Sequence, residues 1–489
     1  MDVTMEKITA LAKSRGFFYP GSDLYGGLAN TYDYGPVGAE LLRNIRNLWW
    51  SYFVTKRSDV VGLDASVISN HKIWEASGHT ASFADAMIDC KNCKSRFRAD
   101  HLIEDYLEDM TDEEKKFTNL VFEPGYFDIS EDEVKNVLET GKVEGLSEVK
   151  LNALIKGFQI KCRKCKQIQW TPVRKFNQLF PVQLGLVEGE GGSAYLRGET
   201  AQNIFIDFKL VVDSNRVRLP FGIAQLGKSF RNEITPGNSI FRTIEFEQGE
   251  LEYFFDPEVT NWEKTFDTWK ETMYTFVTQA LGVQSEKLRW RTHSDEERSF
   301  YSTKTEDLEY QFPFGFKELW GLAYRTDYDL QNHMKNSGRD LSIVDPQTGK
   351  KIVPHVIEPA VGINRLLLMV LSDAFTQEED RVVLKFAPKV APVKAAVFPL
   401  LANKPELTEL AQKVYQTLQE KVNGKILWDD RGNIGKRYLS QDEIGTPYCI
   451  TVDFQSLEDQ SVTVRDRDSK EQKRVAISEL VSYIQERLV

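Results

Sequence analysis

Four of the five cysteines stand as two pairs, Cys90 with Cys93 and Cys162 with Cys165, with two residues inside each pair. Thiolates at this spacing suit the tetrahedral shell of a structural zinc ion, and in a reducing compartment such pairs indicate a metal rather than disulfides. The 68 residues between the pairs include runs of Glu, Asp and Lys that are typical of short surface helices. We therefore predict a zinc-binding insertion, residues 86–170, inside a larger domain. The alternative is four free buried thiols.

The fifth cysteine and two histidines are not expected to belong to this metal site. Cys449 lies in an apolar segment and is predicted to be a packed core thiol. His71 and His79 are predicted to take part in polar networks, because four cysteines already complete a zinc shell.

The composition excludes several classes of protein. With 489 residues, 41% hydrophobic and 28% charged, the chain has an ordinary globular balance and is long enough for about three domains. Residues 1–16 show no secretory signal, and the longest aliphatic run, about residues 366–371, is too short to cross a membrane. We therefore expect a cytoplasmic protein with no membrane partner. The net charge is −11, and residues 390–489 carry 14 basic against 15 acidic side chains, so DNA is not expected as a partner and RNA would need local patches.

Changes of pattern along the chain indicate further domain boundaries. Prolines near residues 385–392 mark a linker, and the strand and helix patterns that follow predict a compact α/β module over residues 387–489. Residues 1–85 and 171–386 would then be the two parts of the main domain, on either side of the insertion. In the first part, Pro36 opens a helix with apolar residues at three- and four-residue spacing. This helix faces a core, or also forms a dimer interface.

Two segments with alternating side chains, residues 221–234 and 240–255, flank a Gly-containing loop and predict a β-hairpin. One face of this hairpin would carry cationic, aromatic and acidic side chains together, among them Arg231, Phe246 and Glu250. A solvated sheet face could hold such charges, but Phe246 would then lie exposed among them. A flat aromatic group beside arginines is better suited to hold a base and phosphates.

Residues 222–229 match the phosphate-binding loop pattern G-x-x-x-x-G-K-S letter by letter. That loop requires a helix to begin directly after the lysine, with its N-terminus at the phosphate. Here the intervening residues are apolar and extended, and a turn at residues 235–238 follows instead. We therefore reject this type of nucleotide site.

Two more segments would complete a site on the hairpin. Residues 195–202 supply an acid beside a base, and residues 356–365 lead from a strand into a helix with Arg365 near its positive end. With these segments the sequence resembles the class II aminoacyl-tRNA synthetases, and in particular the homodimeric glycyl-tRNA synthetases, over nearly its whole length. The matches follow the order of the chain: residues 34–38 resemble motif 1, residues 230–234 and 241–248 resemble motif 2, and residues 358–365 resemble motif 3. Residues 317–321, and residues 435–447 in the C-terminal module, also match the family.

The resemblance implies an α+β fold, with a class II synthetase antiparallel sheet flanked by helices, the zinc-knuckle insertion and a C-terminal α/β anticodon-binding domain. It implies glycine, ATP and tRNA(Gly) as substrates and a homodimer as the active form. Arg231 and Arg365 would contact the α- and γ-phosphates of ATP. Glu233 and Phe246 would hold the adenine, and Glu318 would bind the accompanying Mg²⁺. The implied catalytic residues are Arg231, Glu233 and Arg365, and the ATP site also includes Asn232, Phe241, Arg242, Leu319 and Gly362.

Glycine offers only an ammonium and a carboxylate group for recognition, so its three N–H donors require acidic acceptors. The resemblance assigns these acceptors to Glu199, Glu250 and Glu358. A rigid, filled, acid-lined pocket would reject alanine by steric clash and desolvation. The implied glycine site also includes Arg98, Phe246, Gln248, Arg325 and Ala360.

Six positions depart from the pattern of the family, namely Gly198, Asn203, Ile244, Gly249, Ala360 and Asn364. None of them removes a predicted phosphate-binding arginine or ammonium-binding acid, so we expect activity to be retained. Two other functions stay open: a synthetase-like paralogue that binds tRNA without chemistry, and an enzyme that adenylates another small acid for a different carrier. An active synthetase of this kind would need no protein nucleophile, because positioning and charge stabilisation are sufficient for the transfer.

Overall fold

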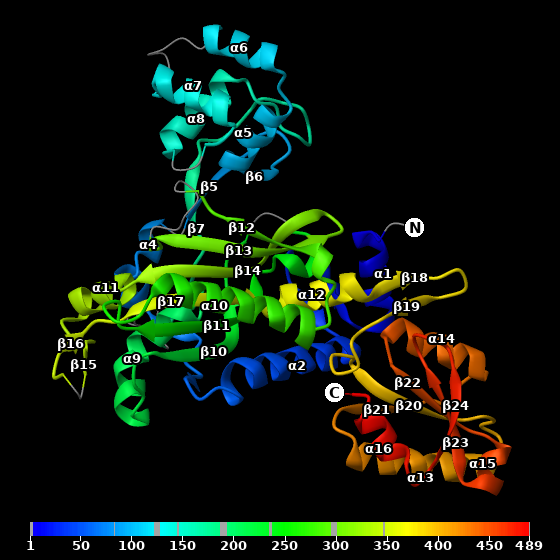
Figure 1. The fold of residues 1–489 in the computed structure, drawn as a ribbon. Coiled ribbons are helices and arrows are strands. Elements are labelled where there is room, and N and C mark those ends of the chain that lie inside the picture. Colours follow the sequence, from blue (N-terminus) through cyan, green and yellow to red (C-terminus); the bar gives the residue numbers. More distant parts are fainter. Residues whose placement is uncertain are drawn as a thin grey trace.

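The computed structural model describes residues 3–82, 84–121, 128–143, 146–185, 193–233, 237–294, 301–345 and 348–488. These residues form a main body, a helical insertion that stands away from it, and a C-terminal module at one end (Figure 1). No helix within these ranges combines the length and the apolar character that crossing a bilayer requires.

A sheet of seven strands, counted over the described ranges, lies at the centre of the main body in the order β12–β13–β14–β17–β11–β10–β3. Every pair of neighbours is antiparallel except β10 and β3, which are parallel. The predicted antiparallel sheet is therefore confirmed. Its strands are β3 (Val60–Gly62), β10 (Phe221–Phe230), β11 (Glu245–Phe255), β12 (Leu288–Thr292), β13 (Lys304–Phe312), β14 (Gly315–Thr326) and β17 (His355–Gly362).

Strands β10 and β11 form the predicted hairpin, in which Gln225 lies opposite Glu250 and Ser229 lies opposite Phe246. Residues 222–229 are extended throughout, as the rejection of a phosphate-binding loop requires. Both strands stop short of the predicted loop. The backbone N–H of Asn232 donates to the carbonyl of Gln178 (2.8 Å), and that of Ile244 donates to the carbonyl of Asn30 (2.9 Å), so neither continues the pairing of the hairpin. Residues 234–236 of the predicted loop lie outside the described residues.

Helices pack on this sheet and enclose the largest core of the described chain. Pro36 is the first residue of α2, and the buried residues of that helix include Leu41, Ile45 and Trp49, so the predicted core face is confirmed. Helix α12 begins at residue 363, which makes Arg365 its third residue. The main helices of the body are α1 (Met5–Arg15), α2 (Pro36–Trp50), α9 (Ala201–Asn215), α10 (Trp262–Thr275), α11 (Tyr328–Ser337) and α12 (Ile363–Ala374).

Shorter elements complete the main body. Helices α3 (His71–Ala76) and α4 (His79–Ser82) stand beside a sheet formed by β4 (Ile68–Asn70), β9 (Ser193–Leu196) and β8 (Phe180–Gln183). Three two-stranded sheets pair β1 (Phe18–Pro20) with β2 (Tyr32–Tyr34), β15 (Ile343–Val344) with β16 (Lys351–Ile352), and β18 (Phe375–Gln377) with β19 (Val382–Leu384).

The insertion has a hydrophobic core of its own, which includes Ile88, Leu102, Val137, Leu154 and Val173. Figure 1 shows that its helices stand off the sheet and are joined to the body through β5 and β7. Its elements are β5 (Ala84–Asp89), β6 (Arg96–Arg98), α5 (Ala99–Glu108), α6 (Asp112–Val121), α7 (Glu131–Thr140), α8 (Glu148–Gly157) and β7 (Arg174–Asn177). The separate core supports an inserted domain, whose core residue Val173 and strand β7 lie beyond the predicted boundary at residue 170. The division at 1–85, 86–170, 171–386 and 387–489 remains a proposal.

The C-terminal module is a five-stranded sheet, in the order β21–β20–β22–β23–β24, with helices packed on it. Cys449 is buried in β22, as predicted. The sequence pattern did not reveal α14, because polar Arg437, Gln441 and Asp442 occupy its buried positions and interrupt the apolar period. The elements are β20 (Val393–Pro399), α13 (Pro405–Lys421), β21 (Lys425–Trp428), α14 (Ile434–Ile444), β22 (Tyr448–Val452), α15 (Phe454–Asp459), β23 (Ser461–Asp466), β24 (Gln472–Ala476) and α16 (Leu480–Gln485).

A buried ion-pair cluster joins this module to the main body. Asp442 of α14 accepts hydrogen bonds from Arg381, between β18 and β19 (2.7 Å), and from Arg465 of β23 (2.9 and 3.0 Å). A second link runs from Asn44 of α2 to the carbonyl of Ala391 (2.9 Å). The module is therefore held at its base by charged contacts that water does not reach.

Candidate active site

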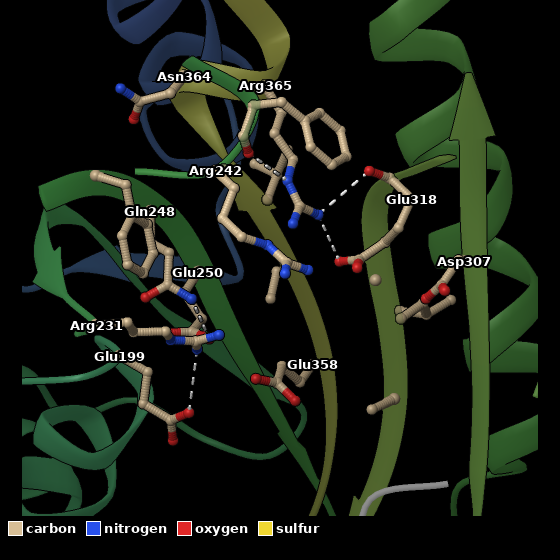
Figure 2. A pocket seen from close by; sticks show the side chains of 18 of the residues that line it. Glu199, Arg231, Arg242, Gln248, Glu250, Asp307, Glu318, Glu358, Asn364 and Arg365 are labelled. Atoms are coloured by element: carbon tan, nitrogen blue, oxygen red, sulfur yellow. Dashed lines mark hydrogen bonds and ion pairs between the residues drawn. The ribbon is translucent and has the colours of Figure 1, made fainter. Parts of the chain in front are cut away.

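A cavity of about 280 Å³ opens over the sheet where β11, β14 and β17 lie side by side. In Figure 2 the labelled side chains of this cavity form two groups: Glu199, Glu250 and Glu358 at one end, and Arg365 with Glu318 at the other. Among the described residues, the cavity is lined by Glu199, Arg231, Glu233, Ile240, Phe241, Arg242, Thr243, Phe246, Gln248, Glu250, His293, Tyr301, Thr305, Asp307, Glu318, Gly321, Leu322, Ala323, Glu358, Ala360, Val361, Gly362, Asn364 and Arg365.

The sheet register explains how these groups meet. Glu250 of β11 lies opposite Ala360 of β17, and Ala360 lies opposite Gly321 of β14. Side chains two residues apart on a strand share a face, so Gln248 and Glu250 project to the same side. Three neighbouring strands thus place acids, an amide and small residues on one floor.

The acidic end is buried and held by hydrogen bonds. The hydroxyl of Thr200 donates to Glu250 (2.5 Å), and Arg325 donates to Glu358 (2.9 Å). Glu199 lies 3.2 Å from Nε2 of His79 and 3.9 Å from the guanidinium of Arg231. Several carboxylates therefore face one small space, with cations arranged behind and beside them.

Charge and burial shift the pKa values at this end in opposite directions. Burial alone would raise the pKa of Glu199, but His79, Arg325 and Arg231 outweigh it and hold that pKa below its ordinary value. Burial, and then the neighbouring Glu358 and Glu199, raise the pKa of Glu250 well above the ordinary range. Burial also raises the pKa of Glu358, with Arg325 opposing the shift. The acids of the pocket thus differ in the direction in which their pKa values are shifted.

Behind this floor, Arg325 is fully buried and forms a second ion pair with Asp329 (2.8 and 2.9 Å). The amide of Gln202 donates both to Asp329 (2.9 Å) and to Glu199 (3.1 Å). His333 contacts the carbonyl oxygen of the same amide (2.9 Å). This chain of contacts fixes the orientation of Glu199 and Glu358 from behind.

The other end of the cavity is more open. Arg365 donates to Glu318 (3.0 Å), and its guanidinium lies over the ring of Phe241 (4.5 Å). The pKa of Glu318 is lowered, mainly by Arg365. Between the two ends, the guanidinium of Arg231 lies 5.4 Å from the centre of the Phe246 ring. This arrangement offers cations and flat aromatic faces to a ligand with phosphates and a base.

Most of the predicted site residues line this one cavity, but four do not. Arg325 lies behind the floor, and Leu319 is buried in the core. Asn232 is engaged through its backbone with residue 178. Arg98 lies in β6 of the insertion, where it pairs with Asp100 (3.1 Å). Arg325 still reaches the acidic end through its hydrogen bond to Glu358, whereas Leu319, Asn232 and Arg98 do not line the cavity.

Sequence patterns did not identify the residues that support the floor, namely Thr200, Gln202, Asp329 and His333. They come from α9, from the segment before it and from α11, and spacing within one segment cannot show that they meet. His79, predicted to be a polar-network residue, bonds to Ser77 (2.8 Å) and Glu199. His293 and Asp307, which are paired at 2.7 Å, also line the cavity without a sequence signal.

The structure accounts for one departure from the family pattern, the glycine at position 249, by the packing of Trp49. A Cβ atom on Gly249, one of the six departing positions, would lie 2.8 Å from the indole ring of Trp49. Trp49 is fully buried in α2, so it occupies the space that a side chain at position 249 would need. This departure therefore reflects core packing under the cavity and leaves its lining intact.

The four cysteines of the insertion also converge. Sγ of Cys90 lies 3.5 Å from that of Cys165, and Sγ of Cys93 lies 3.6 Å from that of Cys162. Tetrahedral zinc with bonds of about 2.3 Å requires S–S separations of about 3.8 Å. Each pair sits in a tight turn closed by the residue directly after it, whose backbone N–H donates to the carbonyl of the first cysteine: Lys94 to Cys90 and Lys166 to Cys162. The donor set and its geometry therefore fit a structural zinc ion.

Three family models match the chain: the glycyl-tRNA synthetase insertion domain 1 at residues 85–178, the class II tRNA synthetase core domain (G, H, P, S and T) at 188–374, and an anticodon binding domain at 394–487. Prolyl-tRNA synthetase from Cryptosporidium parvum shares the fold, with a TM-score of 0.60 over 98% of this chain and 74% of that one, at 16% identity.

Two curated relatives are similar over almost their whole length. The glycine–tRNA ligase of Clostridium acetobutylicum is 49% identical over 99% of both chains. That of Caldanaerobacter subterraneus is 48% identical, again over 99% of both. The chain therefore belongs to the glycine–tRNA ligase family of class II aminoacyl-tRNA synthetases.

Proposed function

We propose that this protein is a glycine–tRNA ligase. It would activate glycine with ATP to form glycyl-adenylate and pyrophosphate, and then transfer glycine to the 3′ end of tRNA(Gly) with release of AMP. The observation that carries the proposal is one cavity that joins a small, buried, acid-lined end to a more open end with arginines and aromatic rings. Glycine and ATP have the shapes and charges that these two ends require.

In the first step the glycine carboxylate attacks the α-phosphorus of ATP, so two anionic groups must approach each other. Arg231 would stabilise the charge that develops on the α-phosphoryl oxygens, and Arg365 would hold the γ-phosphate. Preorganised cations of this kind provide the main catalysis in phosphoryl transfer. Glu318, on the open side, would share the binding of the Mg²⁺ that neutralises the phosphates of ATP.

The acidic end would bind the ammonium of glycine. Glu250 and Glu358 lie on the floor, and Glu199 lies at the side next to Arg231. The buried Arg325 holds Glu358 in place, so that Glu358 would not move aside for a larger amino acid. Glycine would thus be selected by three charge-assisted hydrogen bonds and by the absence of room for a Cβ substituent.

The insertion would hold one structural zinc ion through Cys90, Cys93, Cys162 and Cys165. A closed four-thiolate shell supplies folding energy and no open coordination position. We expect about one zinc per chain by elemental analysis, with loss of the metal in Cys162→Ser and retention in the matched control Cys449→Ala. A metal-free wild-type protein of unchanged stability would contradict the proposal.

The C-terminal module would contact the anticodon of tRNA(Gly), and the protein would act as a homodimer. The anticodon-binding family of that module supports the first statement. The dimer rests on the similarity of the segment that opens α2 to motif 1, and light scattering of the purified protein would test it.

The decisive experiment is ATP–pyrophosphate exchange with each standard amino acid, followed by charging of a tRNA(Gly) transcript and of an unrelated tRNA. We expect exchange with glycine alone and charging of tRNA(Gly) alone. Exchange without charging would indicate an adenylating enzyme for another carrier. Binding of tRNA(Gly) by a folded, zinc-loaded protein without exchange would identify a noncatalytic paralogue.

A further inference from the structure

Beneath the acidic end of the cavity lies a fourth carboxyl group, that of Glu252, which the proposed mechanism does not use. Glu252 follows Glu250 by two residues on β11, so both side chains leave the same face of the strand. One carboxylate oxygen from each of Glu250, Glu252 and Glu358 lies within 4.8 Å of the others. These three residues form a buried cluster, the carboxyl trio.

The three members of the trio are stabilised very differently. Glu250 accepts a hydrogen bond from Thr200, and Glu358 accepts one from Arg325. Glu252 is fully buried, and neither of its carboxyl oxygens has a hydrogen-bond partner. A buried carboxylate without a partner is costly, so Glu252 is the member least able to carry a negative charge.

The groups around the trio do not supply enough positive charge for three anions. Arg325 of β14 already pairs with Asp329 of α11 and with Glu358. Arg231 and His79 face Glu199, which is a further acid at the same end. Arg197, beside β10, is the other cation that acts on Glu250. Tyr301 lines the cavity with its ring 3.8 Å from the Arg325 guanidinium, and His333 of α11 contacts Gln202 behind the floor. The neutral neighbours of the trio are Gln225, Gln248 and Thr200.

We propose that Glu250 carries a proton while the amino-acid site is empty and releases it when the ammonium group of glycine binds, whereas Glu252 remains an uncharged acid in both states. This inference rests on the glycine-binding function proposed above. It makes the proton a competitor of the substrate for one position on the floor of the cavity.

The binding of one ammonium group is balanced by the release of one proton from Glu250. Glycine enters as a zwitterion, with its amino group already protonated near neutral pH. Its ammonium would donate to Glu250 and Glu358, which line the cavity, while Glu252 lies below them and is not part of the lining. The positive charge favours ionisation of Glu250, and the proton leaves to solvent through the open cavity. Burial and the like charges of Glu358 and Glu199 raise the pKa of Glu250, which is why the empty site retains that proton.

Isothermal titration of the zinc-loaded protein with glycine, in two buffers of different ionisation enthalpy at one pH, measures the protons released. We expect a value approaching one proton per site below the pKa of Glu250. Glycine that binds without proton release would overturn the inference and leave the proposed function intact. Absence of glycine binding would instead count against the proposed function.

Two variants assign the proton to a residue. In Glu250→Gln, kcat/KM for glycine in the exchange reaction should be low and flat with pH. In the wild type, kcat/KM should rise roughly tenfold per pH unit up to the pKa of Glu250. Glu252→Gln replaces an uncharged acid by an isosteric amide, so it should keep both the proton release and the rising profile. Loss of the release in Glu252→Gln would show that Glu252 is the ionising group and would overturn the assignment.

Discussion

The two ends of the cavity contain the same kind of ion pair at nearly the same distance. Arg325 meets Glu358 at 2.9 Å at the acidic end, and Arg365 meets Glu318 at 3.0 Å at the open end. The first pair is almost completely buried, whereas 22% of the Arg365 side chain and 49% of the Glu318 side chain are exposed. Distance alone therefore does not tell what each pair contributes.

The difference in burial indicates a difference in function. Separating a buried pair leaves an uncompensated charge in a medium of low dielectric constant, so the Arg325 pair acts as a fixed support. An exposed pair loses little when it opens, because water replaces the missing partner. In the proposed function, Arg365 and Glu318 would therefore separate at small cost to bind phosphate and Mg²⁺, while the acidic end would keep one shape for glycine.

The largest effect is expected from removing the buried cation. Arg325→Met should lower the free energy of unfolding of the catalytic domain by about 3–5 kcal/mol, because Glu358 and Asp329 lose their partner. Arg365→Met, the matched control, should cost no more than about 1 kcal/mol. Urea unfolding followed by tryptophan fluorescence measures both. Equal costs for the two variants would abolish the distinction between the two ends.

The exposed pair should matter for binding ATP. Arg365→Ala would remove charge-assisted hydrogen bonds worth about 1.5–3 kcal/mol, which corresponds to a loss of roughly 10- to 150-fold in kcat/KM for ATP. The KM for glycine should change little, because the acidic end does not depend on Arg365. Steady-state pyrophosphate exchange separates the two constants. An equal rise in both would mean that the ends are mechanically coupled.

The rigidity of the acidic end predicts rejection of alanine. A pocket that yields to one extra methyl group discriminates by about 1–3 kcal/mol, or roughly 10- to 200-fold, and this fixed floor should reach at least that range. The ratio of kcat/KM for glycine and alanine in the exchange reaction tests the prediction. Similar values for the two amino acids would show a soft pocket.

The smallest effect concerns pH. Because its pKa is raised, Glu250 favours the empty folded state most below the ordinary glutamate pKa, and this contribution is lost as pH rises through the raised pKa. Stabilisation by a fixed glycine concentration should therefore increase with pH, by up to about 1.4 kcal/mol per pH unit in that window. Melting temperatures with and without glycine, from pH 5 upward, would show the trend. Glu250→Gln serves as the control, and its glycine shift should not depend on pH.

The sequence predicted the parts of the site that lie within single segments. The β10–β11 hairpin, the position of Arg365 near the start of α12 and the exclusion of a phosphate-binding loop all follow from local alternation, helix polarity and turn residues. The support behind the floor could not be predicted in this way. Gln202 and Asp329 are 127 positions apart and meet only because α9 and α11 pack together.

Helix α14 escaped prediction for a related reason. Its buried face carries Arg437, Gln441 and Asp442, whose polar groups are satisfied by partners outside the helix. A pattern based on hydrophobic residues treats such positions as exposed. The same limit applies to Arg98, whose place in β6 of the insertion depends on how the sheet of that domain pairs.

The carboxylate of Asp442, shared between Arg381 and Arg465, has a consequence for RNA selection. Both arginines are nearly buried, so the C-terminal module is set at one distance from the cavity and swings from it only at considerable cost. The distance between the C-terminal module and the cavity is then fixed. If the module contacts the anticodon as proposed, a tRNA whose acceptor end and anticodon do not match that distance would have to bend to be charged, and the length and stiffness of the RNA would contribute to its recognition.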